Sequence, residues 1–469
     1  MPRSTGSRDA PDRWGAPDRW GRETGDRWSL VVVAGLLSFV AMLDMSIVNV
    51  ALVDIGADLG VPPRAAQWAV LGYQLPVVAL LLPVGRWLDR TAIRPVLLSA
   101  LAGFALCSTG AALAPGMVWL IAARLAQGAF GAALFVLMPV LATRAVRPQV
   151  RGRAMSVPAT LGPLGAVSGP ALGGLLTDQW GWRAVLLVKL PLCLLAWLIA
   201  RASLPRDGAV RPPGPREATD TALVAAAVAV VLLALTLAPG SPLWTAAALL
   251  AAVPVVLWAR GPGARPVVAV LRDARTAPVH GAVLAAGAAF AAMHYATALH
   301  LQRDNGLSAS ATGATLLAFP LGMALAGPLG GRLADRFGPR PVAVTGSALV
   351  ASGFVLLAAG PDGSPPQLAW RLAVAGIGMG LYGGPSQFLV MRAVPAEHLA
   401  TAGSTVQLAR SLGFTLGPAL ATAAWGLAGS EDSGARPALV VAAVAACLAV
   451  PLLAHRPRNI PEPVAEQQH

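Results

Sequence analysis

The stretch GRWLDRTAIRPV, residues 85–96, occurs a second time in diverged form as GRLADRFGPRPV, residues 331–342. Seven of the twelve aligned positions are identical, and the two copies lie 331 − 85 = 246 residues apart. Two shorter pairs repeat at offsets of 247 and 248 residues: ARLA (123–126) with WRLA (370–373), and SGPAL (168–172) with LGPAL (416–420). Three matches at nearly the same offset indicate that the chain is a duplication of two halves.

The composition around these repeats is that of an integral membrane protein. Apolar residues make up 56% of the 469 residues and charged residues only 12%, about half the roughly 25% that is usual in a soluble domain. The net charge of +13 also fits nucleic-acid binding, but the arginines alternate with apolar segments, so we expect no nucleic-acid partner. The three cysteines lie inside apolar runs without metal-ligand spacing, so we expect no metal and no other cofactor.

Apolar segments long enough to cross a membrane recur along the chain. A spanning helix needs about 20 predominantly apolar residues. We therefore predict an all-α integral membrane protein with fourteen transmembrane helices, at 29–53, 66–86, 95–114, 116–143, 154–177, 183–202, 219–238, 242–259, 279–301, 307–331, 341–360, 367–391, 400–428 and 435–454. The seventh and eighth of these helices are the weakest, because only APGSP (238–242) separates them.

The repeat divides the predicted helices into two halves of six, with helices 7 and 8 inserted between them. The predicted organisation is a disordered cytoplasmic tail (1–28), a first half (29–202), loops with the inserted helices (203–278), a second half (279–455) and a cytoplasmic tail (456–469). The first tail contains Asp-Arg-Trp three times. We expect its Trp and Arg side chains to rest at the membrane interface, and a partner-binding role is the alternative. The tail lacks the features of a signal peptide.

Loop charge alternates from one side of the membrane to the other. Arginine-rich loops follow predicted helices 2, 4, 8 and 10, whereas the intervening loops carry almost no basic residues. Positively charged loops remain in the cytoplasm. We therefore expect a multi-pass protein of the cell (plasma) membrane with both termini in the cytoplasm.

A duplicated six-plus-six arrangement with this loop motif resembles the major facilitator superfamily. The two additional central helices resemble the fourteen-helix drug:proton antiporter branch of that family. The resemblance implies a small-molecule substrate bound between two halves that rock against each other in the lipid bilayer. It also implies that a proton gradient supplies the energy, and we expect a monomer.

The two copies of the loop motif carry the predicted gating residues: Gly85, Asp89, Arg90, Arg94, Gly331, Asp335, Arg336 and Arg340. We expect the glycines to permit a tight turn. We expect Asp89 to accept hydrogen bonds from a facing helix N-terminus and to pair with an arginine, which would latch the halves together on the cytoplasmic side. The alternative is that these charges only set the topology. The first copy departs from the family pattern at Trp87, Ala92 and Ile93, whereas the second keeps Gly338.

The fifth predicted helix contains small residues at four-residue spacing around a proline: Gly165, Gly169, Pro170, Gly173 and Gly174. Such spacing lets helix backbones approach closely in lipid, and simple close packing is one interpretation. The pattern also resembles the helix 5 signature of the antiporter branches, which implies export. Its second-half counterpart keeps only Gly417-Pro418, so we assign this specialisation to the first half.

A carboxylate, Asp44, lies in the middle of the first apolar segment, although a charge at the bilayer centre costs roughly 2.5 to 3.5 kcal/mol. Its surroundings, LDMSIVNVALV (43–53), resemble the helix 1 signature of the antiporter branch. We predict that Asp44 binds the coupling proton and can meet a cationic substrate; the alternative is that it only hydrogen-bonds neighbouring helices. Arg124 is expected either to set the proton affinity of Asp44 or to hold backbone carbonyls. Phe290 stands at the 246 offset from Asp44, so coupling should be asymmetric.

Polar residues inside other predicted helices are candidates for the substrate cavity: Asn49, Gln127, Lys189, His294, Gln407 and Arg410. Lys189 stands where the family pattern has Asn, and it either snorkels to the outer surface or faces the cavity. A lone His such as His294 is more often a packing residue than a proton carrier.

No enzyme motif and no nucleotide-binding phosphate loop is present in the sequence. The first hypothesis is therefore a proton-coupled exporter of small amphipathic drugs or secondary metabolites, as in multidrug or antibiotic efflux. The second is an exporter of anionic metabolites bound by Arg124, Lys189 or Arg410. The third is a non-transporting membrane sensor or scaffold, which predicts no proton-coupled flux.

Overall fold

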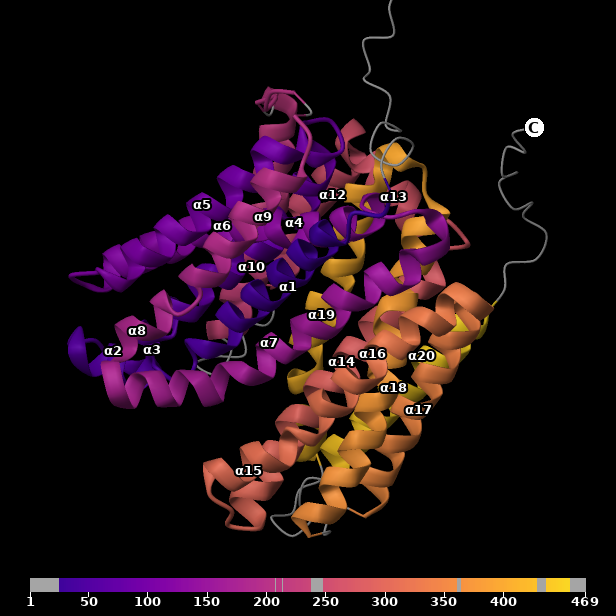
Figure 1. The fold of residues 1–469 in the computed structure, drawn as a ribbon. Helices are drawn as coiled ribbons and strands as arrows, with labels where there is room; N and C mark the ends of the chain where they lie inside the picture. Colours follow the sequence, from indigo (N-terminus) through magenta and orange to yellow (C-terminus); the bar gives the residue numbers. More distant parts are fainter. Residues whose placement is uncertain are drawn as a thin grey trace, which may run out of the picture.

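A computed structural model describes residues 25–206, 208–212, 214–237, 248–360, 364–427 and 436–455. Within these ranges the fold is all-helical, and no strand occurs (Figure 1). The predicted tails fall largely outside the described residues, as do positions 242–247 of the eighth predicted helix. The described end of the first tail contacts the first half, since Asp26 pairs with Arg147 at 3.2 Å.

The first half comprises α1 (Trp28–Ile47), α2 (Leu52–Asp58), α3 (Pro63–Ala66), α4 (Trp68–Leu88), α5 (Ile93–Ala112), α6 (Met117–Arg144), α7 (Arg151–Trp180), α8 (Trp182–Leu187) and α9 (Leu190–Ser203). The insert comprises α10 (Pro215–Leu237), a 3-10 turn (Ala248–Ala251), α12 (Ala252–Arg260) and α13 (Arg265–Arg272). The second half comprises α14 (Ala277–Leu299), a π-helical turn (His300–Asp304), α15 (Ala309–Leu316), α16 (Ala318–Phe337), α17 (Pro339–Ala359), α18 (Pro365–Ala393), α19 (Leu399–Leu427) and α20 (Arg436–Ala454).

Every segment predicted to span the membrane contains helix in the part of the chain that the structure describes. Ten helical segments there are long and apolar enough to cross a bilayer. α18 and α19 are 29 residues each, but they are rich in Gly, Ser, Thr and Gln, which lowers their hydropathy. The segment after α12, expected to be a loop, instead forms the short helix α13, whose Val267 and Val270 are buried.

The packing of helices repeats between the halves. α1 packs on α7 as α14 packs on α19, and α6 packs on α4 and α5 as α18 packs on α16 and α17. Contacts across the halves are also paired, because α7 meets α16 and α19 meets α4. The internal repeat read from the sequence is therefore a repeat of structure.

Close approach of glycines explains the pairing of α1 with α7. A Cβ on Gly165 would overlap the backbone of Phe39, and a Cβ on Gly173 would lie 2.8 Å from the carbonyl oxygen of Ile47. Gly169 likewise leaves no room for a Cβ beside Ser46, whereas Gly174 has nothing within 4 Å. Small residues thus let the two backbones touch.

The expectation that this packing is special to the first half was wrong. In α19, a Cβ on Gly413 or Gly417 would overlap the backbone of α14 at Leu284 or Ala288. Gly413 and Gly417 stand 248 residues after Gly165 and Gly169. The same close contact is therefore built into both halves.

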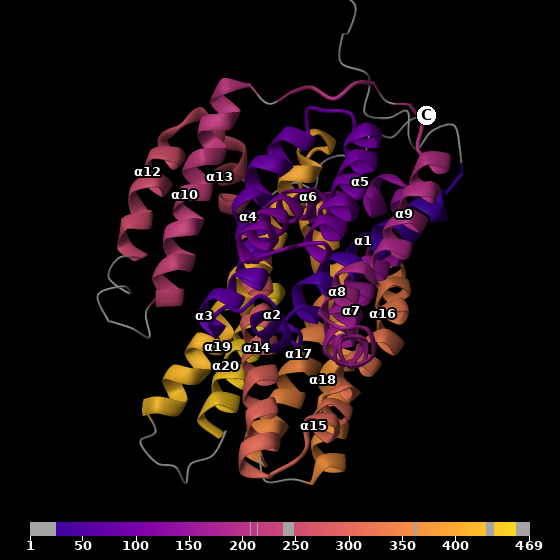
Figure 2. The ribbon, with the colours of Figure 1, turned by 90° about the vertical axis from the view of Figure 1, so that its left-hand side faces the viewer.

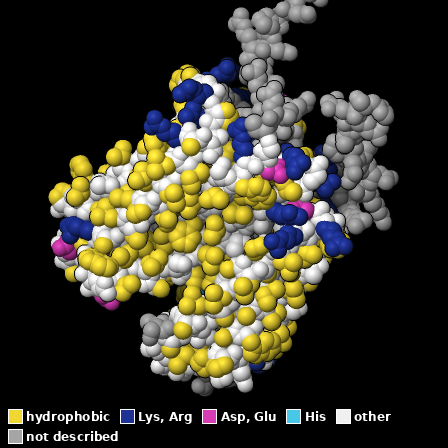
Figure 3. All heavy atoms as spheres, in the orientation of Figure 1, with side chains coloured by type: hydrophobic (Ala, Val, Ile, Leu, Met, Phe, Trp, Pro, Cys, Tyr) yellow, Lys and Arg dark blue, Asp and Glu magenta, His cyan; other side chains and the backbone are white. Residues whose placement is uncertain are grey.

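The insert attaches to the first half through α10, which packs against α4, and α12 packs on α10 on the side away from α4 (Figure 2). Arg86 pairs with Asp220 at 2.7 Å, and Arg90 pairs with Glu217 at 3.2 Å. The two halves meet at the end that carries the arginine-rich loops, and they diverge toward the end where α2, α3 and α8 lie apart from α15 (Figure 1). Figure 3 shows a notch between the halves on that diverging side, in a face covered mostly by hydrophobic side chains.

Candidate functional site

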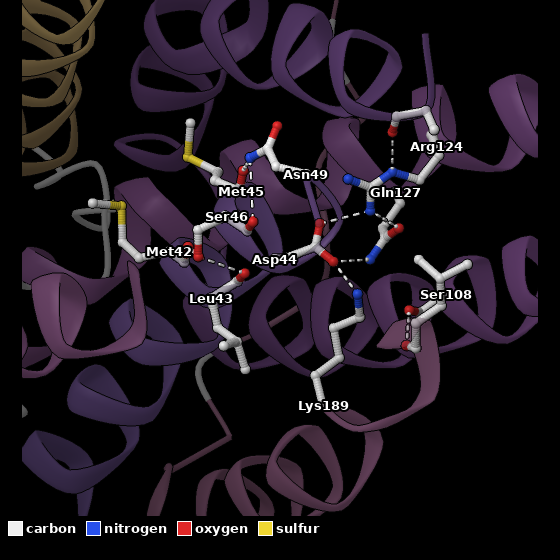
Figure 4. A network of polar contacts seen from close by, with 12 residues as sticks. Met42, Leu43, Asp44, Met45, Ser46, Asn49, Ser108, Arg124, Gln127 and Lys189 are labelled. Carbon is white, nitrogen blue, oxygen red and sulfur yellow. Dashed lines mark hydrogen bonds and ion pairs between the residues drawn. The ribbon is translucent and has the colours of Figure 1, made fainter. Parts of the chain in front are cut away.

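A buried polar cluster lies inside the first half, between α1, α6 and the break between α8 and α9 (Figure 4). Asp44 accepts a hydrogen bond from Arg124 Nη1 at 2.7 Å through Oδ2, and from Gln127 Nε2 at 3.3 Å through Oδ1. The ammonium group of Lys189 also donates to Oδ1 of Asp44. The side chains of Asp44 and Lys189 are 0% exposed and that of Arg124 is 1% exposed, so the cluster is sealed from solvent.

Arg124 is fixed on several sides. Its Nε donates to the carbonyl oxygen of Ala69 at 2.7 Å, and its Nη1 also donates to Gln127 Oε1 at 2.8 Å. Its guanidinium lies 4.7 Å from the ring centroid of Tyr73. Arg124 therefore both contacts the acid and holds a backbone carbonyl, while its effect on the proton affinity of Asp44 stays a prediction. Nη2 has no partner among the described residues.

Lys189, which reaches Asp44, lies at a short interruption of the helix. α8 ends at Leu187 and α9 begins at Leu190. Pro191 has no backbone N–H to continue the ladder of hydrogen bonds, and its ring disfavours helix in the residues before it. Neither role considered for Lys189 holds in this structure, since it neither snorkels to the surface nor faces the cavity.

The cluster contains one carboxylate and two cations. Burying charges is tolerated only when they are paired and hydrogen-bonded, and removing one partner leaves an uncompensated charge. Protonation of Asp44 would leave two neighbouring buried cations without a counter-charge. The charge of Asp44 is therefore the counter-charge on α1 for both Arg124 of α6 and Lys189 at the start of α9.

A cavity of about 430 Å³ lies between the halves. Its wall is formed by α1 and α7 of the first half and by α14, α16, α18 and α19 of the second. Aromatic rings form a cluster in this wall: Phe290 lies 5.2 Å from Phe319 and 5.6 Å from both His294 and Phe414, measured between ring centroids. The position between two repeated halves is that of a substrate site in many transporters.

The predicted cavity residues separate into two groups. Asn49, His294 and Arg410 line the cavity, whereas Gln127, Lys189 and Gln407 do not. Gln127 and Lys189 lie in the sealed cluster, and Gln407 is buried beside Arg410, whose Nη1 lies 3.5 Å from its Oε1. Asp44 is also separated from the cavity, so a cationic substrate in the cavity has no contact with it in this structure. Met42, Met45 and Ser46, on the same helix, do line the cavity.

Sequence reasoning missed most of the aromatic wall. Phe290 was noted only as the residue at the offset of Asp44. Phe319, Tyr382 and Phe414 lie in apolar segments where nothing distinguishes them from packing residues. Their convergence depends on the contact between helices of one half and becomes visible only in three dimensions.

The closed end of the molecule is held by two matching latches. Asp89 follows α4 and accepts hydrogen bonds from the backbone N–H groups of Ala400 at 2.8 Å and Thr401 at 3.0 Å, at the start of α19. The hydroxyl of Thr401 also donates to Asp89 at 2.6 Å. Burial raises the pKa of Asp89, although these hydrogen bonds act in the opposite direction.

The second latch has the same design with the halves exchanged. Asp335, near the end of α16, accepts from the backbone N–H groups of Gly152 at 2.8 Å and Arg153 at 3.3 Å, at the start of α7. It also pairs with the Arg153 guanidinium at 3.3 Å. Helix N-termini favour such carboxylates. Among the described residues the expected arginine partner is present for Asp335 but not for Asp89.

The other residues of the motif have roles that differ from the expectation. Gly85 lies inside α4, and a Cβ there would meet the carbonyl oxygen of Ala400 at 2.9 Å. A Cβ on Gly331 would likewise lie 2.8 Å from Arg153 Cα, so both glycines permit contact between the halves and neither makes a turn. The tight turn instead occurs at Gly338, whose φ of +86° favours glycine.

The arginines of the motif hold elements on their own side of the interface. Arg94 donates to the carbonyl oxygen of Arg201 at 3.0 Å. Arg340 donates to backbone carbonyls at Leu453 and His455, and Arg336 lies over the ring of Phe337. Together with the pairing of Arg90 to the insert, these contacts brace each half while the two aspartates join the halves.

Comparison with known proteins gives a consistent result. The sequence profile of the Major Facilitator Superfamily matches residues 34–262 and 279–468. The chain is 28% identical over 451 residues to "Multidrug resistance protein Stp" of Mycobacterium tuberculosis, which covers 94% of this chain and 79% of the relative. It is 30% identical over 412 residues to "Drug efflux pump JefA" of the same species, which covers 84% of this chain and 80% of the relative.

Two solved structures share the fold. The human organic anion transporter MFSD10 (TETRAN) superposes with a TM-score of 0.64 at 16% identity, covering 92% of this chain and all (100%) of that one. The proton:xylose symporter XylE superposes with a TM-score of 0.63 at 15% identity, covering 91% of this chain and 94% of that one. At these identities the likeness concerns the fold alone.

Proposed function

This chain belongs to the Major Facilitator Superfamily, and we propose that it is a secondary active exporter that moves small amphipathic compounds out of the cell in exchange for protons. It is a membrane-embedded transporter with multidrug efflux relatives, not an enzyme. The proposal adds the direction of transport, the coupling ion, a span count of fourteen and a plasma-membrane location with both termini in the cytoplasm.

One observation carries the proposal: α1 lies between the cavity and the buried polar cluster, and these two sites are separate. On one side Met42, Met45 and Ser46 line the cavity, and on the other Asp44 is sealed with Arg124 and Lys189. A substrate and a proton can therefore act on the same helix without touching each other. Substrate binding displaces α1 from the cavity side, and protonation of Asp44 loosens it from α6 and α9.

The two latches, at Asp89 and Asp335, explain how one end of the cavity is closed in the proposed transport cycle. Both lie at the end with the arginine-rich loops, which the positive-inside rule assigns to the cytoplasm. The structure would then be closed to the cytoplasm and open toward the outside. Transport requires both latches to break, so that rocking of the halves exposes the cavity to the other side.

The test is accumulation of a fluorescent amphipathic dye in everted membrane vesicles that contain the protein. Acidification of the vesicle interior should drive uptake, and a protonophore should abolish it. Vanadate, a phosphate analogue that inhibits ATP-driven pumps, should have no effect. Uptake that persists after the proton gradient has collapsed would contradict proton coupling. A protein that moves no dye and no metabolite under any gradient would favour the sensor or scaffold hypothesis.

A further inference from the structure

We propose that the cavity selects amphipathic organic anions with an aromatic body, and that Arg410 binds their negative group. This inference deepens the proposed export function and rests on it for transport, although binding can be tested independently. The sequence offered Arg124, Lys189 and Arg410 as possible binding residues for an anionic substrate. Only Arg410 remains, because Arg124 and Lys189 do not line the cavity.

The charge of the cavity wall is positive. Arg410 is the one charged side chain among the described residues that line the cavity. Its guanidinium Nη1 lies 3.5 Å from Gln407 Oε1, one turn earlier on α19, which is at the limit for a hydrogen bond. No described acidic side chain lies within 4 Å of it to form an ion pair. A guanidinium has five donors in a planar fork that fits a carboxylate or phosphate, and most of these donors remain available to a ligand.

A cationic ligand finds no counter-charge in the same wall. The acid of α1, Asp44, is turned away and held by Arg124 and Lys189. A cation placed in the cavity would therefore meet only the like charge of Arg410. An anion would offset the cost of burying that guanidinium, because an unpaired buried charge is strongly unfavourable.

The rest of the wall suits a flat aromatic body. Phe290, Phe319 and Phe414 present ring faces and edges around the cavity. His294 and Tyr382 add two polar side chains to this otherwise largely apolar wall. The cavity volume of about 430 Å³ is within the roughly 300–1,000 Å³ typical of small-molecule sites.

A pair of dyes with one skeleton and opposite charge tests this inference. Fluorescein is a xanthene anion and rhodamine 6G is a xanthene cation. Binding of each dye to the purified full-length protein in nanodiscs is measured by fluorescence anisotropy. We expect fluorescein to bind more tightly than rhodamine 6G. Arg410→Gln should weaken fluorescein binding by about tenfold or more, as expected for a lost hydrogen bond to a charged group, and Arg410→Lys should restore part of the loss.

The matched control is Arg260→Gln, at the exposed end of α12 and outside the cavity, which should leave fluorescein binding unchanged. Arg410→Glu should reverse the preference in favour of rhodamine 6G, a gain that a misfolded variant would not show. Tighter binding of rhodamine 6G by the wild type, or unchanged fluorescein binding by Arg410→Gln, would overturn the inference. Binding of fluorescein through Arg410 without proton-driven transport would instead contradict the export function and leave the anion site standing.

Discussion

Asp89 and Asp335 make the same contact from opposite halves of the molecule. They lie 335 − 89 = 246 residues apart, and each accepts two backbone hydrogen bonds from the first turn of a helix in the other half. Because of the duplication, the interface between the halves contains two equivalent latches, one contributed by each half, and both must break for this end to open. Each latch joins a carboxylate to a helix N-terminus, a contact that forms and breaks without a change in covalent structure.

Loss of one latch should shift the protein toward the state open at this end. Asp89→Ala should raise the ratio of open to closed molecules by about tenfold or more, because hydrogen bonds to a charged group are each worth about 1.5–3 kcal/mol. Spin labels at exposed Gln149 and Glu397, in equivalent loops of the two halves, report the distance across the closed end. Cys107 and Cys447, which are not buried, are replaced first.

Asp335→Ala should give the same shift, and the exposed Asp54→Ala, on the diverging side, should give none. A distance distribution that is unchanged by both latch substitutions would show that the aspartates do not hold the halves together.

The closed latch should be favoured by acid. The pKa of Asp89 is raised in the closed state by burial, whereas an exposed carboxyl in the open state would have its ordinary value. The closed state then binds a proton more tightly, so lowering the pH from about 8 to about 5 should increase the closed population. The same spin-label pair measures this effect, and Asp89→Asn should reduce it. Opening on acidification would contradict the assignment.

The glycine contacts between α1 and α7 provide an internally controlled prediction. Gly169→Leu should lower the melting temperature and abolish transport, because a Cβ there already overlaps α1 at Ser46. Gly174→Leu lies five residues further along the same helix with nothing within 4 Å of a Cβ, and it should have little effect on either quantity. Thermal unfolding of the two purified variants makes the comparison.

The equivalent substitution in the second half, Gly417→Leu, should be as harmful as Gly169→Leu because Gly417 packs against Ala288 in the same way. If Gly417→Leu behaved like Gly174→Leu, close packing would be a property of the first half alone.

Substitution of Lys189 should change the pH dependence of efflux while leaving the thermal stability of the protein unchanged. Lys189→Asn leaves Asp44 paired with Arg124 and removes the excess positive charge, so we expect the thermal stability to be retained. Asp44 would then keep a proton more readily, and the pH dependence of efflux should shift upward. Arg124→Gln should be more disruptive, because it also removes the hydrogen bond to Ala69 and the contact with Tyr73. A pH profile identical to that of the wild type would exclude Lys189 from coupling.

The sequence predicts most of the architecture because duplication and hydropathy are local signals. The motif around Asp89 identified both latches, since its helix-end position and its repetition at Asp335 are visible in the chain. The proximity of Asp44 and Arg124 was foreseen only through the helix 1 and helix 4 signatures. The role of Gly85 was misread, because close approach of another helix cannot be distinguished from a turn without knowing the partner.

Which side chains face the cavity and which lie in the buried cluster was harder to predict than the arrangement of the helices. Lys189 reaches Asp44 from the short break between α8 and α9, and hydropathy does not report the direction in which its side chain points. Gln127 and Gln407 are polar and deep, as expected of cavity residues, yet helix rotation directs them elsewhere. His294 and Arg410 face the cavity by the same kind of rotation. Which side of a buried helix a residue occupies is decided by packing with distant segments.

Proton coupling through Asp44 is the central claim, and one comparison tests it most directly. Wild type and Asp44→Asn are reconstituted in proteoliposomes, and exchange of dye without a gradient is measured beside accumulation driven by a proton gradient. Asp44→Asn should retain exchange and lose gradient-driven accumulation, with Asp44→Glu recovering part of it and thermal unfolding confirming that the variants are folded. Equal gradient-driven accumulation by wild type and a folded Asp44→Asn would contradict the claim.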